Sequence, residues 1–222
     1  ASKQDADILM RAADGAVYGD IFVRSVYRMR PYELTPGSVN ACHRKWAEKC
    51  KAFLVSRRPG IPAFFRMCRQ IIEDFDSIPI SDTPKPRVGI VGEILVKFAP
   101  AANNHLVELL EAEGAEAVVP DLLDFMFYCF YNQLYKSEHF GTSKKTAFVA
   151  KAGIRAMEWM RSAATKAFEK SRHFHAPTRI ETIAGYAEPI VSIGNQTGEG
   201  WFLTGELVEL IKSGTNNIDC TQ

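Results

Sequence analysis

A glycine-rich loop is the strongest local signal for chemistry in this sequence: residues 194–200 read GNQTGEG. Backbone N–H groups of such a loop approach an anion closely, and a helix that starts there adds the favourable end of its dipole. The spacing is neither the dinucleotide fingerprint nor a P-loop. A ligand-facing loop and a simple strand-to-helix turn therefore stay open as interpretations. The candidate binding residues are Gly194, Asn195, Gln196, Thr197, Gly198 and Gly200.

The five cysteines suggest no disulfide framework, because their number is odd and their spacing irregular. Cys42 and Cys50 are about 12 Å apart along one expected helix, too far to share a metal ion. Cys68 and Cys129 lie among apolar residues and are expected to be buried. No C-x-x-C motif occurs, so a self-contained zinc or iron–sulfur site is not expected. Cys220 ends an expected strand and is the candidate metal ligand.

Four short apolar segments are expected to be the strands that position these residues: 87–93, 115–119, 190–193 and 217–220. The first two flank a helical segment, which makes a βαβ unit. We predict that the first strand is central, between 115–119 and 190–193. Ligands bind beyond the carboxyl ends of parallel strands. Glu93, the glycine loop and Cys220 are therefore predicted to share one edge of the sheet.

The predicted fold class is α/β, with a small Rossmann-like four-stranded parallel sheet, helices on both faces, a large helical insertion and an N-terminal helical subdomain. The expected boundaries are a helical subdomain at 1–80, a proline-rich linker at 81–86 and the α/β domain at 87–222, with the insertion at 121–188. Ser38 is a candidate N-cap in the first part, and Asn103 or Asn104 is one in the second.

The insertion contains two further patterns. Residues 124–140 are rich in aromatic side chains, which suits a helix buried partly in the core and partly against a neighbouring domain. Basic residues then recur along the next helix and are expected to form a solvated face: Lys144, Lys145, Lys151, Arg155, Arg161 and Lys166.

Charge and hydropathy exclude some classes of partner. Lys and Arg number 27 against 26 Asp and Glu, a net charge of +1, which argues against a nucleic-acid partner. No apolar run approaches the ~18 residues of a transmembrane helix, so no membrane partner is expected. The N-terminus lacks a signal-peptide pattern, and a cytoplasmic location is expected.

Four stretches of the chain are similar to one known family. They read KPRVGIVGEILVKFAPAANNHLVELLEAEGAEAVVP at 85–120, DLLDF at 121–125, YCFYN at 128–132 and GNQTGEGWFLTGELVELI at 194–211. They resemble the large activator proteins related to 2-hydroxyglutaryl-CoA dehydratase, the CoA-substrate-specific enzyme activases. The resemblance covers residues 31–222 and is most specific in the first and last of these stretches.

The resemblance implies a function. Members of this family join actin-type ATPase modules to domains resembling dehydratase subunits, and they transfer low-potential electrons through iron–sulfur clusters. The phosphate motifs of the ATPase module are absent here. We therefore expect a non-catalytic domain fragment, without a cofactor of its own, of an ATP-dependent activator. In the full-length protein, Cys220 matches the first cysteine of a cluster motif. The implied partners are neighbouring domains of the same chain and an enzyme of the 2-hydroxyacyl-CoA dehydratase type.

Two alternatives come from other classes of protein. The chain could be an autonomous flavodoxin-like module for a flavin or nucleotide, although residues 92–97 after the first strand read GEILVK, long and apolar for a phosphate loop. It could also be a pure interdomain docking domain, with the aromatic helix as its interface and the glycine loop as a mere turn.

Overall fold

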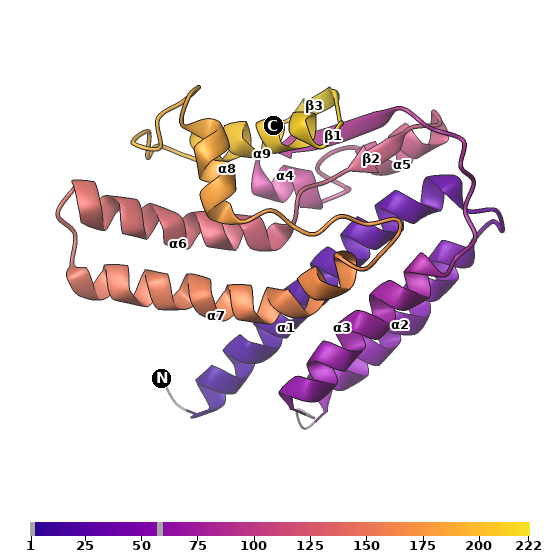
Figure 1. Cartoon of the computed structure of the whole chain (residues 1–222), viewed down its shortest axis with the longest axis horizontal. Coiled ribbons are helices and arrows are strands. Elements are labelled where there is room, and N and C mark those ends of the chain that lie inside the picture. Colours follow the sequence, from indigo (N-terminus) through magenta and orange to yellow (C-terminus); the bar gives the residue numbers. More distant parts are fainter. Residues whose placement is uncertain (1–2, 57–59) are drawn as a thin grey trace. The chain divides into compact units, whose positions relative to one another are not determined.

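The protein, described here from a computed structural model, consists of two compact units (Figure 1). The structure describes residues 3–56 and 60–222. One unit comprises the chain up to Thr83 together with Met157–Pro177, and the other comprises Pro84–Ala156 together with Thr178–Gln222. Helix α7 (Lys144–Phe168) contributes to both. The segment expected as an insertion into the α/β domain is thus divided, because Met157–Pro177 packs with the N-terminal helices.

The first unit is helical. Helix α1 (Lys3–Met29) continues into a short 3-10 helix (Arg30–Tyr32), and it packs against α2 (Ser38–Val55) and α3 (Ile61–Asp76). Apolar side chains from all three helices form its core: Val17, Ile21, Val39, Phe64, Ile71, Ile72 and Phe75. Burial of these faces at helical spacing is the main stabilisation of such helices.

The start of α2 differs from the expectation that Ser38 is its N-cap. Ser38 is the first residue of the helix, and Gly37 precedes it with a φ of 85°, a left-handed conformation that favours glycine. The carboxylate of Glu33 caps the helix instead, accepting hydrogen bonds from the backbone N–H groups of Gly37 and Val39 at 2.6 and 2.8 Å. A carboxylate is favoured at this end of the helix dipole.

The second unit contains a three-stranded parallel sheet in the order β2-β1-β3. Strand β1 (Arg87–Gly92) is central, with β2 (Glu116–Val118) on one side and β3 (Asn217–Thr221) on the other. The predictions that this first strand is central and that 115–119 lies beside it are confirmed. Ile90 and Val91 point to opposite faces of β1, and both are buried. Both faces of the central strand are therefore covered.

The predicted fourth strand at 190–193 is wrong. These residues form a turn that follows α8 (Ile180–Ala187), where the N–H groups of Ile190 and Val191 both donate to the carbonyl of Ala187. The apolar run at 190–193 thus follows the end of α8, and β3 occupies the position beside β1 that was predicted for this run. A mixed α/β fold with a parallel sheet holds, with three strands in the described residues.

Helices cover this sheet. Helices α4 (Ile94–Phe98) and α9 (Gly200–Lys212) contact β1, and α5 (Leu106–Ala112) contacts β2. The sequence did not predict α4, and α8 lies at the end of the helical insertion predicted at 121–188. Asn103 and Asn104 were the two predicted N-cap candidates for α5. Asn103 does contact the start of this helix, where its Oδ1 accepts a hydrogen bond from the N–H of Leu106 at 3.2 Å. The residue directly before the helix is His105.

Helix α6 (Leu122–His139) supplies aromatic side chains to the core of this unit. Phe127 and Tyr128 are buried, and Tyr128 stacks on Phe202 of α9 with ring centroids 5.0 Å apart. Phe140, just after the helix, is exposed. On α7, Arg161 departs from the expected solvated face, because its side chain is buried and its Nη2 lies 2.7 Å from Oε1 of Glu158. Across the described residues, no helix is both long and apolar enough to span a membrane.

Candidate functional site

Strands β1 and β3 end at the same edge of the sheet, where Gly92 pairs with Thr221. Glu93 therefore lies beside the end of β3, the strand that contains Cys220. Cys220 pairs with Val91, and the N–H of Glu93 donates to the carbonyl of Thr221 at 3.2 Å. Gly92 has a φ of 147°, and a Cβ at this position would overlap the Thr221 carbonyl. Only glycine fits where the two backbones approach so closely. Cys220 itself is exposed.

The side chain of Glu93 caps the helix that follows it. Its Oε2 accepts hydrogen bonds from the N–H groups of Leu95 and Val96 at 2.9 and 3.0 Å. These are the donors that a bound phosphate would use at this helix start. The protein's own carboxylate thus holds the anion position after the first strand.

Three side-chain hydrogen bonds join α6 to the glycine loop and to the first turn of α9, two of them to the loop itself. Tyr128 Oη donates to the carbonyl of Gly198 at 2.6 Å. Asn132 Oδ1 accepts from both Gln196 Nε2, at 3.1 Å, and Trp201 Nε1, at 3.0 Å. Gly198 has a φ of 69°, so the turn at this position requires a residue that tolerates left-handed backbone. Hydrogen bonds from α6 thus hold the loop at Gln196 and Gly198.

The other candidate residues of the loop differ in accessibility. Asn195, Thr197 and Gly200 are exposed, whereas Gly194 is half-buried, with its N–H donating to Ser192 Oγ at 3.1 Å. The loop follows the turn at 190–193, and it leads into α9 as predicted. The accessible part of the candidate set is thus the tip of the loop before α9.

A buried ion pair that sequence reasoning missed lies behind this edge. Lys97 Nζ donates to both carboxylate oxygens of Glu206 at 3.0 Å, and their side chains are only 1% and 0% exposed. The ammonium group also lies 5.3 and 5.9 Å from the ring centroids of Phe98 and Phe202. Burial raises the pKa of Glu206 to about 7, although the neighbouring Lys97 opposes that shift.

Glu199, in the glycine loop, feels the charge of Glu93 at the sheet edge. Burial raises the pKa of its carboxyl group, the nearby charge of Glu93 raises it further, and Lys97 acts in the opposite direction. Its Oε2 is buried without a hydrogen-bond partner. Lys97 is thus paired with Glu206, and the charges of Glu93 and Lys97 both act on Glu199. This charge balance disfavours a free anion at the edge, contrary to what the glycines alone suggest.

The cysteines separate into buried and accessible groups. Cys50 and Cys68 are buried, and burial raises the pKa of the Cys50 thiol to about 12 and that of Cys68 well above its ordinary value. Cys129 was expected to be buried, but it is exposed, as is Cys220. Among residues 3–56 and 60–222, no group of three or more His, Cys, Asp or Glu side chains is arranged to hold a metal ion.

Comparison with protein-family models, with curated proteins and with solved structures gives no match for this chain.

Proposed function

We propose that this chain is a non-catalytic domain of an ATP-dependent iron–sulfur electron-transfer activator that acts on an enzyme of the 2-hydroxyacyl-CoA dehydratase type. The resemblance of residues 85–120 and 194–211 to the activases suggests the class. The observation that carries the proposal is the exposed thiol of Cys220 at the carboxyl edge of a parallel sheet, where ligands of such sheets bind.

Cys220 would be one ligand of a cluster shared with another domain. An iron–sulfur cluster of the common types takes four thiolate ligands. The described part of the chain brings one cysteine to this edge, so the residues fit a single ligand and not a complete set. Neighbouring domains of the same protein would supply the others.

The carboxyl groups near the edge would tune such a cluster. Negative charge near an iron–sulfur cluster stabilises its oxidised form and lowers its reduction potential. Glu93 and Glu199 would act in this way, and a low potential suits a donor of energetic electrons. The same carboxyl groups would repel a CoA phosphate and also the anionic cluster, but covalent Fe–S bonds to Cys220 and to the other thiolates would hold the cluster against this repulsion. We therefore assign the edge to electron transfer rather than to binding of the CoA phosphates.

A pure docking domain is the second candidate, favoured by the outer edge of β3. Strand β3 pairs with β1 alone among the described strands, and its other side presents unpaired backbone groups. Such an edge readily accepts a strand from another domain. The attachment of the glycine loop to α6 also suits a loop that serves only as a turn. The flavodoxin-like alternative is disfavoured, because Glu93 occupies the donors that a flavin phosphate would need.

An absorption spectrum and a metal analysis of the anaerobically purified proteins test these candidates. The 222-residue chain is expected to be colourless and without ATPase activity, and the natural full-length protein that carries it is expected to show broad cluster absorption with iron and sulfide. Flavin bands in either protein would contradict the proposal. A full-length protein free of iron would contradict the electron-transfer proposal and favour the docking function.

A further inference from the structure

A groove in the first unit has the composition of a ligand site. It lies between α3 and the C-terminal part of α7, and its volume is about 530 Å³, within the range of roughly 300–1,000 Å³ that is usual for small-molecule sites. Every residue that lines it belongs to this one unit. It is independent of the sheet edge and of the function proposed for it.

One wall of the groove is a stripe along the whole of α3. The lining residues recur every three or four positions from Pro62 to Asp76, over roughly 21 Å of helix. Phe65 provides the largest apolar surface of this wall, and its ring lies 5.6 Å from that of Trp159. The facing wall on α7 carries two small residues, Ala163 and Ala167. An apolar body can therefore lie along the floor.

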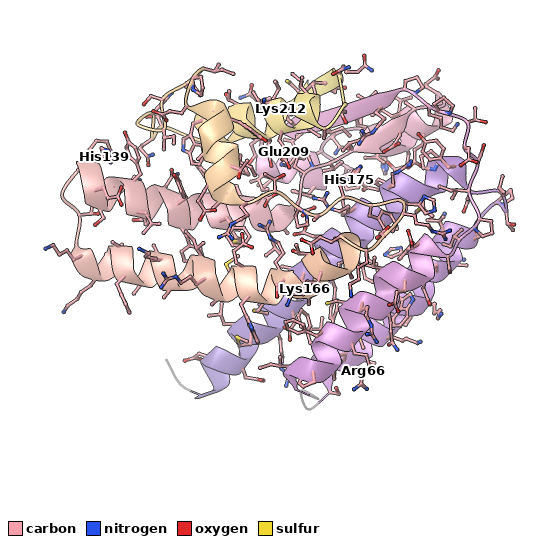
Figure 2. All side chains as sticks on the ribbon, viewed as in Figure 1. Arg66, His139, Lys166, His175, Glu209 and Lys212 are labelled. Atoms are coloured by element: carbon pink, nitrogen blue, oxygen red, sulfur yellow. The ribbon has the colours of Figure 1, made fainter. Side chains whose placement is uncertain are left out.

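Cations line both walls. Arg66 and Arg69 come from α3, and Lys166 and Lys170 come from α7 and the turn after it. Figure 2 labels Arg66 and Lys166 on these two segments. Four basic side chains thus face two acidic ones, those of Glu73 and Asp76. The lining carries a net positive charge.

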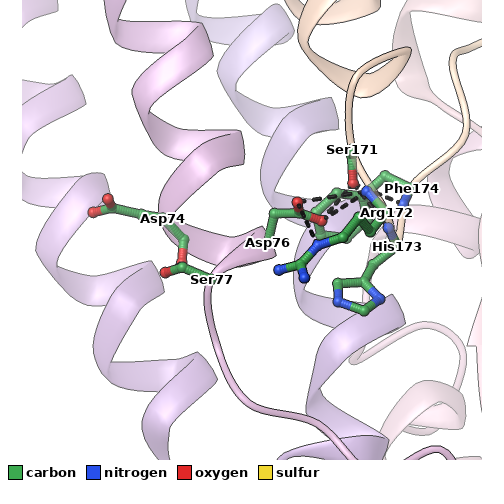
Figure 3. A network of polar contacts seen from close by, with 7 residues as sticks. All are labelled: Asp74, Asp76, Ser77, Ser171, Arg172, His173 and Phe174. Atoms are coloured by element: carbon green, nitrogen blue, oxygen red, sulfur yellow. Dashed lines mark hydrogen bonds and ion pairs between the residues drawn. The ribbon is translucent and has the colours of Figure 1, made fainter.

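Both acidic side chains already have partners in the protein. Asp76 accepts hydrogen bonds from Ser171 Oγ at 2.6 Å and from the N–H of Arg172 at 3.2 Å, and Arg172 Nε lies 3.9 Å from its carboxylate (Figure 3). Glu73 lies 3.6 Å from Arg69.

The remaining cations, Arg66, Lys166 and Lys170, are exposed and make no hydrogen bond or ion pair within the described part of the chain. They are available to an anion from outside.

We propose that this groove binds a small amphiphilic anion: a molecule with an aliphatic or flat apolar body and a carboxylate or phosphate head. The apolar body lies over Phe65 and the alanines of α7. The head lies between Arg66 and the lysines of the facing wall, where charge-assisted hydrogen bonds are strongest. A small molecule is preferred to an acidic peptide because cations and apolar side chains alternate within one groove of about 530 Å³ rather than forming a long apolar face.

The test is a binding titration of the whole chain with decanoate, decyl phosphate and the neutral decanol, all below their aggregation limits. Trp159, which is 48% exposed and contacts Phe65, reports binding by its fluorescence, and calorimetry provides the affinity. We expect both anions to bind and decanol to bind at least ~10-fold more weakly, a difference of one decade in Kd. Tighter binding of decyl phosphate would identify the head as a phosphoryl group, and equal binding would show that a carboxylate suffices.

Two double variants separate the groove from general surface charge. Arg66→Gln with Lys166→Gln removes one free cation from each wall and is expected to weaken binding of both anions by at least ~10-fold. Arg44→Gln with Lys49→Gln removes two exposed cations of α2 in the same unit and is expected to leave binding unchanged. Circular dichroism checks that all variants fold.

Four results would overturn the proposal, and three of them are absence of binding, binding that ignores the head group, and equal loss of binding in both double variants. Binding of a polyglutamate peptide in place of the amphiphiles would also overturn it, and would assign the groove to an acidic protein segment.

Discussion

The sheet edge and the α3–α7 groove are both rich in charged side chains, but the fold uses these charges in opposite ways. At the edge, Glu93 caps its own helix, and Lys97 is buried against Glu206. In the groove, Arg66 and Lys166 reach solvent without partners in the described residues. The charge of a side chain therefore does not reveal whether it is available to a ligand. Its partners and its burial do.

The largest effect is expected from breaking the buried pair. Lys97→Met removes the ammonium group and retains most of the volume, which leaves Glu206 without its partner in the core. We expect a loss of about 3 kcal/mol in the free energy of unfolding at pH 8, measured by urea denaturation. Arg66→Gln, the matched change in the groove, should stay within about 0.5 kcal/mol of the wild type. Equal effects of the two substitutions would remove the contrast between the regions.

The next effect is a pH dependence that belongs to Glu206. Burial raises its pKa from 4.5 to about 7 in the folded protein, so between these values the unfolded chain releases the proton and the folded protein retains it. Stability from this group is therefore highest below about pH 4.5, falls as the pH rises to about 7, and is level above that. Lys97, Glu199 and Glu209 are the charged neighbours that influence this titration.

Urea denaturation of the wild type and of Glu206→Gln at several pH values checks this dependence. The difference in unfolding free energy, wild type minus variant, is expected to decrease from pH 4.5 to pH 7, because titrations common to both proteins largely cancel. A difference that increases over this range would show that Lys97 holds Glu206 ionised, against the direction assigned here.

A smaller effect is expected where the glycine loop is attached to α6. Asn132→Ala removes the single oxygen that accepts from Gln196 and Trp201, and leaves the buried indole N–H without its partner. We expect a loss of about 1–2 kcal/mol and faster hydrogen exchange at residues 194–200. Tyr128→Phe removes the hydroxyl that donates to Gly198, leaves the indole N–H bond in place and should cost less. Unchanged exchange in both variants would show that the loop is held by its glycine turn alone.

The sequence predicted the parts of the fold that local patterns determine. The apolar run with glycines at 87–92 identified the central strand, and the helix starting near Trp201 was located within one residue. The run at 190–193 misled because its Ile and Val residues suit either a buried strand or a helix end. Whether this run forms a strand depended on the position beside β1, which is occupied by β3, a segment later in the chain.

The chemistry behind the edge could not be predicted in the same way. Lys97 and Glu206 are 109 residues apart, and each lies in a largely apolar helix that carries other charged residues nearby, Glu93 before Lys97 and Glu209 after Glu206. The sequence does not show which of these charged residues is buried, and it does not identify the partner. The capping role of Glu93 was likewise hidden, because α4 itself was not predicted. Cys220 was placed correctly at a strand end, since that position follows from the strand alone.

The central claim is that Cys220 at this edge ligates a cluster, and the most direct measurement is iron and acid-labile sulfide per chain in the natural full-length protein, purified without oxygen. Cys220→Ser is compared with Cys129→Ser, since both cysteines are exposed and neither change removes core volume. We predict that Cys220→Ser loses most of the iron and sulfide with unchanged folding, whereas Cys129→Ser keeps them. Wild-type iron content and electron transfer in Cys220→Ser would contradict the claim.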